Sequence, residues 1–121
     1  WKGLGHALAG GNGVPRLGAV GTLLPASPVA MAIDGGKPLG SAVLVIGSPA
    51  IDAPFKGGIL VPMPAVLFFG LPLDATGHFG GGGTWYGGLP SGTSVYFQAW
   101  IADAAGPFGW SATNGLVGTT P

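Results

Sequence analysis

The chain alternates short apolar runs with clusters of Gly, Pro, Asn and Asp, which is typical of strands joined by turns. The clearest run is residues 94–102 (SVYFQAWIA), in which alternate residues from Val95 to Ile101 face one side of a strand. Residues 66–71 (VLFFGL) are continuously apolar, which predicts a central strand buried on both faces. The other predicted strands are residues 4–9, 16–23, 28–33, 41–47, 58–61, 110–113 and 116–120.

Helix is disfavoured throughout, because 26 Gly and 12 Pro recur every few residues and interrupt any helical period. Strands with no helices between them cannot form parallel crossovers, so the sheets are predicted to be antiparallel and packed face to face. The predicted fold is all-β, an immunoglobulin-like antiparallel β-sandwich of seven to nine short strands. Asp74 and Asp103 each begin an Asp-x-x-Gly sequence and are predicted to cap turns. Four consecutive glycines, residues 80–83, predict a loop or a bulged edge.

The first predicted strand has one bulky side and one smooth side. Leu4, His6 and Leu8 alternate with Gly or Ala, and the eight residues from Lys2 onward span roughly 26 Å when extended. The Gly-rich residues that follow predict a flexible joint. We therefore divide the chain into residues 1–13, a strand and joint that pairs in cis or is donated to a neighbour, and residues 14–121, the sandwich body. The candidate subunit-interface residues are Trp1, Leu4, His6 and Leu8.

Charge changes this picture, because only 7% of the residues are charged and the formal net charge is zero. A diffusing domain usually keeps itself soluble with a surface of roughly 25 to 35% charged residues. The composition therefore indicates a surface that is covered by other copies of the chain, by other domains or by glycan, and of these we favour assembly. Nucleic acid is excluded as a partner, because the four basic residues are scattered along the sequence: Lys2, Arg16, Lys37 and Lys56.

Few residues are available for catalysis or metal binding. The chain has no Cys, no Glu, four Asp and two His, and His6 and His78 belong to no metal-binding or general-base motif. It also lacks a G-x-S-x-G elbow, and its Gly-rich stretches do not link a strand to a helix, as a phosphate loop would. We expect no enzyme activity, no cofactor and no metal.

The start of the chain and its hydropathy bear on location. The sequence begins with Trp1 rather than Met, which we interpret as a processed, exported form, secreted or held at the cell surface. The longest apolar stretch, residues 59–73, contains three prolines and is shorter than the ~20 residues of a membrane helix. No membrane span is predicted.

Several motifs spread over nearly the whole chain carry a resemblance to a known module. They are residues 10–17 (GGNGVPRL), 25–29 (PASPV), 54–58 (PFKGG), 73–77 (LDATG), 98–103 (QAWIAD) and 111–116 (SATNGL). They resemble a β-sandwich domain found at the C-termini of secreted proteins of environmental bacteria and, more loosely, subunits of donor-strand filaments. The resemblance implies no established activity and transfers no functional residue. Many copies of that module carry a Cys pair, which this chain lacks.

Two functions are consistent with these observations. The first is a structural subunit of an extracellular fibre or surface assembly, in which copies of the chain join head to tail by β-strand addition. The alternative is a polysaccharide-binding module of a larger secreted protein, because exposed aromatic side chains on a sandwich stack on sugar rings. The candidates for carbohydrate contact are Trp85, Tyr86 and Trp110.

Overall fold

A computed structural model describes residues 1–121 and contains only strands, turns and loops. Every strand pairing is antiparallel, so the all-β, antiparallel prediction is confirmed. No helix long and apolar enough to cross a membrane is present. The eleven strands are β1 (Lys2–Gly5), β2 (Arg16–Val20), β3 (Pro28–Asp34), β4 (Ser41–Gly47), β5 (Ala50–Phe55), β6 (Gly58–Pro62), β7 (Val66–Pro72), β8 (Phe79–Thr84), β9 (Ser94–Ala102), β10 (Trp110–Ala112) and β11 (Gly115–Thr119).

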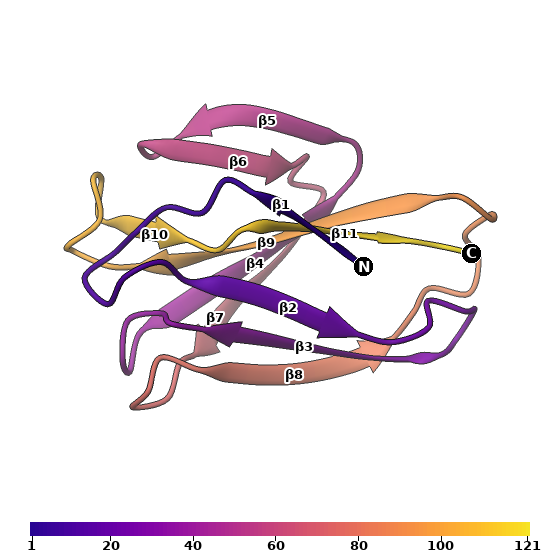
Figure 1. The fold of residues 1–121 in the computed structure, drawn as a ribbon, viewed down its shortest axis with the longest axis horizontal. Coiled ribbons are helices and arrows are strands. Elements are labelled where there is room, and N and C mark those ends of the chain that lie inside the picture. The colour runs from indigo at the N-terminus through magenta and orange to yellow at the C-terminus, as the bar shows by residue number, and fades with distance from the viewer.

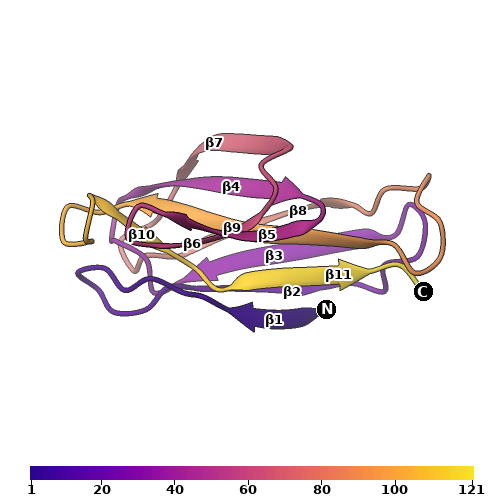
Figure 2. The same cartoon turned by 90° about the horizontal axis from the view of Figure 1, so that it is seen from above.

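The strands form three stacked layers, an arrangement consistent with a β-sandwich that carries an extra hairpin (Figure 1). The middle layer has the strand order β1-β11-β9-β4-β7, with β10 also paired to β9. One of its faces packs on the three-stranded sheet β2-β3-β8, and the other packs on the β5–β6 hairpin. Figure 2 shows β7 and β1 at opposite edges of the middle layer.

The number of strands exceeds the predicted seven to nine because two were missed. β5 contains Asp52 and Pro54, residues that are depleted in strands, and it is held by pairing with β6. β8 consists largely of the four glycines and was predicted as a loop or a bulged edge. It lies at an edge, as predicted, but pairs with β3 without any register shift.

The central strand of the molecule is β9, whose two faces contribute to two separate cores. Phe97, Ala99 and Ile101 belong to the core between the middle layer and the three-stranded sheet. Trp100 belongs to a smaller core under the β5–β6 hairpin. The alternation predicted for residues 94–102 is therefore confirmed.

Gln98 is fully buried and joins the hairpin to the middle layer. Its Oε1 accepts hydrogen bonds from the Val61 backbone N–H at 2.9 Å and from the Trp100 indole at 3.0 Å. Its Nε2 donates to the carbonyl oxygens of Ile59 at 3.0 Å and Thr113 at 3.1 Å. A buried amide satisfied on both sides fixes the position of the hairpin, because any shift leaves polar groups without partners.

The position predicted for residues 66–71 is wrong, because β7 is an edge strand rather than a central one. Four successive residues on it are largely exposed, from 42% at Leu67 to 71% at Phe69. Two residues near the C-terminal end of the strand fit this edge position. Gly70 has a φ of 68° beside a register shift against β4, and Pro72 cannot donate to a second neighbour.

The N-terminal segment is shorter as a strand than predicted, and in this structure it pairs in cis with β11. β1 ends at Gly5 because Gly5 and His6 both have positive φ, 73° and 64°. The Gly-rich residues that follow are not free, since the Gly11 N–H donates to Asp103 at 3.0 Å and the Asn12 amide donates to the Gly36 carbonyl at 3.1 Å. The predicted continuous ridge and flexible joint are thus replaced by a short strand and an anchored turn.

Candidate functional site: an apolar groove between two sheet edges

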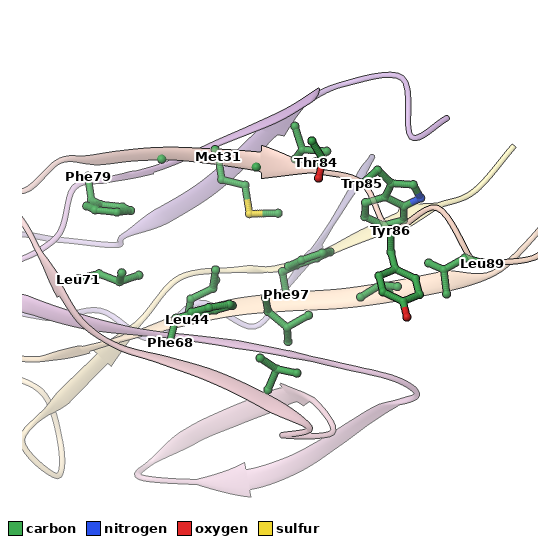
Figure 3. A pocket seen from close by; sticks show the side chains of 17 residues that line it. Met31, Leu44, Phe68, Leu71, Phe79, Thr84, Trp85, Tyr86, Leu89 and Phe97 are labelled. Atoms are coloured by element: carbon green, nitrogen blue, oxygen red, sulfur yellow. The ribbon is translucent and has the colours of Figure 1, made fainter. Parts of the chain in front are cut away.

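A groove of about 550 Å³ opens where the edge strands of two layers, β7 and β8, lie on the same side of the molecule (Figure 3). Side chains from β4, β7 and β9 form one wall, and β3 and β8 form the other. Figure 3 shows Phe79 and Trp85 near opposite ends of the groove.

The groove exists because β8 has no side chains on the middle part of its inner face. Gly81 and Gly83 lie opposite Met31 and Val29, which pack against the core. Residues directly opposite each other share a face of the sheet, so both glycines face the interior. A Cβ atom at Gly83 would meet nothing within 4 Å.

The lining of the groove has almost no polar character. Thirteen of its 17 residues are hydrophobic, and none is charged. Thr84 and Tyr86 supply the only side-chain hydroxyls, and Tyr86 is 71% exposed. Such a surface suits apolar side chains, since charged groups would lose hydration without gaining a partner. It also offers few partners for the hydroxyl groups of a sugar.

The three predicted carbohydrate contacts do not form one surface. Trp85 is 5% exposed, its ring meets Trp1 edge-on at 5.7 Å, and its indole N–H donates to the Thr120 hydroxyl at 3.1 Å. It continues the inward alternation of β8, so it is a core residue that forms part of the groove wall. Tyr86 lies at the same groove, whereas Trp110 lines a hollow on the opposite face of the middle layer.

The predicted interface residues of the N-terminal segment are also dispersed. The Trp1 ring lies 5.5 Å from that of Phe97 and covers one side of the main core. Leu8 forms a bridge with Ala112 and packs in the smaller core. Leu4 is half-buried and His6 is exposed. The bulky ridge exists only in an extended segment, which this structure does not contain.

Two predicted turn caps are confirmed. The Asp74 carboxylate accepts hydrogen bonds from the Thr76 hydroxyl at 2.7 Å and from the backbone N–H groups of Thr76 and His78. These bonds hold the pKa of Asp74 below its ordinary value. Asp103 accepts from the N–H groups of Gly11 and Ala105, each at 3.0 Å. No group of three or more His, Cys, Asp or Glu side chains lies together.

His78 and Asp34 form the ion pair of the molecule, with Nδ1 and Oδ1 2.7 Å apart at the entrance to β8. The hydrogen bond to Asp34 raises the pKa of His78 above its ordinary value of 6.5. Because the pKa is raised in the folded state, the stabilisation is present below pH 6.5 and is lost as the pH rises through the folded-state value.

We therefore expect the His78 ring to titrate with a midpoint above 6.5 in an NMR pH series, and an Asp34→Asn variant to return the midpoint toward 6.5. The wild type should melt at a higher temperature than His78→Gln, and this difference in melting temperature should be larger at pH 5.5 than at pH 8.5. Equal midpoints in wild type and Asp34→Asn would show that the pair does not form in solution.

The functional signal that the sequence analysis missed is the spacing F-G-G-G-G-T-W of residues 79–85. In a strand, this spacing places two inward glycines between two inward aromatic residues, which leaves a hollow. Comparison of the chain with protein-family models, with curated proteins and with solved structures finds no match.

Proposed function

We propose that the protein is a structural subunit of an extracellular fibre or surface assembly, built on an immunoglobulin-like sandwich. Copies join head to tail when one copy adds a β-strand to the next. The observation that carries the proposal is the free edge of β8 beside an uncharged, apolar groove of about 550 Å³.

The edge of β8 is a template for strand addition. It pairs on one side with β3 and leaves the backbone N–H and C=O groups of its other side without strand partners. Edge strands are normally protected by charges, prolines or bulges, and residues 79–84 contain none of these. A strand added here would place every second side chain in the groove and the others in solvent.

The N-terminal segment of a neighbouring copy has the chemistry that this edge requires. When extended, it places Leu4, His6 and Leu8 on one side and Gly or Ala on the other. In its own copy β1 is short, with four residues of which three are exposed. Release costs the packing of Trp1 on Trp85 and Phe97 and the two backbone hydrogen bonds between Leu8 and Ala112, which the new pairing must replace.

The composition supports assembly. Thirteen large apolar residues are exposed in a chain with 7% charged residues, and burial against copies of the chain covers part of that surface. The proposed extracellular location rests on the resemblance to modules of secreted bacterial proteins. Polysaccharide binding has less support, because the aromatic candidates lie on opposite faces or in the core.

The experiment that tests the joint is a Gly83→Val variant, because a Cβ there meets nothing within 4 Å, so the Val side chain projects into the groove, and Val favours the strand. The matched control is Gly18→Val, a strand position on β2 where a Cβ also meets nothing within 4 Å. We expect filaments by negative-stain microscopy for the wild type and Gly18→Val, and folded protein without filaments, by circular dichroism and sedimentation, for Gly83→Val.

Two results would contradict the proposal. A wild-type protein that remains monomeric at high concentration and is retarded on a polysaccharide gel would favour the alternative function. Filaments of Gly83→Val that match the wild type would remove the groove beside β8 as the joint.

A further inference from the structure

The free edge of β7 lies between two apolar hollows, one on each face of the middle layer. Val66 and Phe68 line the groove that faces the three-stranded sheet. Leu67 and Phe69 line a second hollow of about 340 Å³, between the middle layer and the β5–β6 hairpin. A strand that pairs with β7 therefore meets apolar surface on both of its faces, unlike a strand that adds to β8.

The second hollow is as apolar as the first. Phe55, Leu60 and Trp100 lie in its wall, and Lys56 is the only charged residue there. The Lys56 ammonium lies over the Phe55 ring at 5.7 Å, so its charge stays at the margin. The occupant of the β7 edge must accordingly be a strand with large apolar side chains on successive positions.

β7 itself is the segment of this chain that has large apolar side chains on successive positions and also lies at a free sheet edge. Residues 66–69 read VLFF and are 47%, 42%, 52% and 71% exposed. The N-terminal segment has bulky residues on one face only, so it would leave one hollow empty. No charge occurs between Val66 and Leu73, so two copies of β7 meet without electrostatic repulsion.

We propose that β7 pairs antiparallel with β7 of a second copy about a two-fold axis, which joins two middle layers into one continuous sheet. Such an interface is isologous and closes at two copies. With the axis at Phe68, Leu67 lies opposite Phe69 of the second copy, and side chains that face the hairpin in one copy do so in the other. Val66 then lies opposite Gly70 of the second copy, so the shift at Gly70 limits the regular pairing to residues 67–69.

The area involved indicates a weak pair. The four side chains together expose on the order of 400 Å² in each copy, taking 150 to 250 Å² for a whole aromatic side chain. A standard interface buries about 800 Å² on each partner. Lateral pairing is thus expected to depend on protein concentration for free subunits and to be reinforced in a fibre, where many copies pair at once. The inference is independent of the head-to-tail joint at β8.

The absence of Cys from the chain gives a direct test of this interface. A Phe68→Cys variant places a single thiol at the two-fold axis, so mild oxidation should yield a cross-linked dimer of two chains on a denaturing gel. Val20→Cys is the matched control, an exposed apolar residue at the edge of the three-stranded sheet. We expect cross-linking of Phe68→Cys to be at least about ten-fold faster than that of the control, because pairing within a sheet holds the two thiols together.

A charge variant provides the second measurement. Phe69→Lys would place two positive charges close together across the axis, and we expect at least about ten-fold weaker self-association by sedimentation. Val20→Lys should behave as the wild type. If the head-to-tail joint is correct, Phe69→Lys fibres should still form but be narrower. Equal cross-linking of the two Cys variants, or unchanged association and fibre width in Phe69→Lys, would overturn lateral pairing and leave the β8 joint untouched.

Discussion

A Gln98→Leu variant is expected to lose about 3–5 kcal/mol of unfolding free energy, since a buried polar group left without its partner costs about 1–3 kcal/mol. Leu has a similar volume but cannot replace the four hydrogen bonds of the amide. The Val61 N–H and the Ile59 carbonyl then lose their partner on β9, and the hairpin loses its polar attachment. The free energy from urea unfolding, monitored by tryptophan fluorescence, measures the loss.

Ser94→Ala is the matched control on the same strand. It removes one exposed hydrogen bond, to the Thr119 hydroxyl at 2.8 Å, and should change stability by no more than about 0.5 kcal/mol. Amide exchange adds a local measurement, because the Val61 N–H should exchange faster in Gln98→Leu even under native conditions. A loss below 1 kcal/mol, with protection at Val61 retained, would mean that the hairpin is positioned by apolar packing alone.

A Trp85→Ala variant is the second change with a large expected effect, about 3–5 kcal/mol of unfolding free energy. The indole is 5% exposed, contacts the rings of Trp1 and Phe97, and donates to Thr120. Its removal leaves a cavity at the end of the groove and an unpartnered hydroxyl. Near-ultraviolet circular dichroism should also change, because the cluster of Trp1, Trp85 and Phe97 loses one of its three rings.

The neighbouring residue supplies the control. Tyr86 is 71% exposed, so Tyr86→Ala should change the unfolding free energy by no more than about 0.5 kcal/mol. The two variants differ by one position in the chain and by the direction in which the side chain points. Similar losses in both would show that the inward alternation of β8 does not extend to Trp85.

Local patterns predicted the features that depend on neighbouring residues in the sequence. The two-faced strand β9 follows from alternation in residues 94–102, and the Asp74 and Asp103 turns follow from side chains that bond backbone N–H groups a few positions away. The absence of helix follows from the Gly and Pro content. These features require no knowledge of distant contacts.

The features that were missed depend on distant pairing. A continuous apolar run such as residues 66–71 is compatible with a central strand or with an unprotected edge, and only the partner of its second side distinguishes them. The glycines of β8 have low strand propensity, and four residues of β3 hold them in the sheet. The groove was not predicted because it requires β7 and β8, which belong to different layers, to lie on the same side.

The anchored turn at Gly11 has a mechanical consequence for the proposed fibre. Asp103 fastens the chain to its own body there, and the Asp103 carboxylate also occupies the space where a side chain at Gly10 would stand. Residues 1–9, the segment proposed to pair with a neighbour, therefore end directly at this anchor. They span at most about 30 Å when extended, and most of that length would lie paired in the neighbour's sheet. Because no flexible linker then separates consecutive sandwich bodies, a tensile force along the fibre axis acts directly on the hydrogen bonds of the sheets. Such a fibre should be stiff and should resist extension until it breaks.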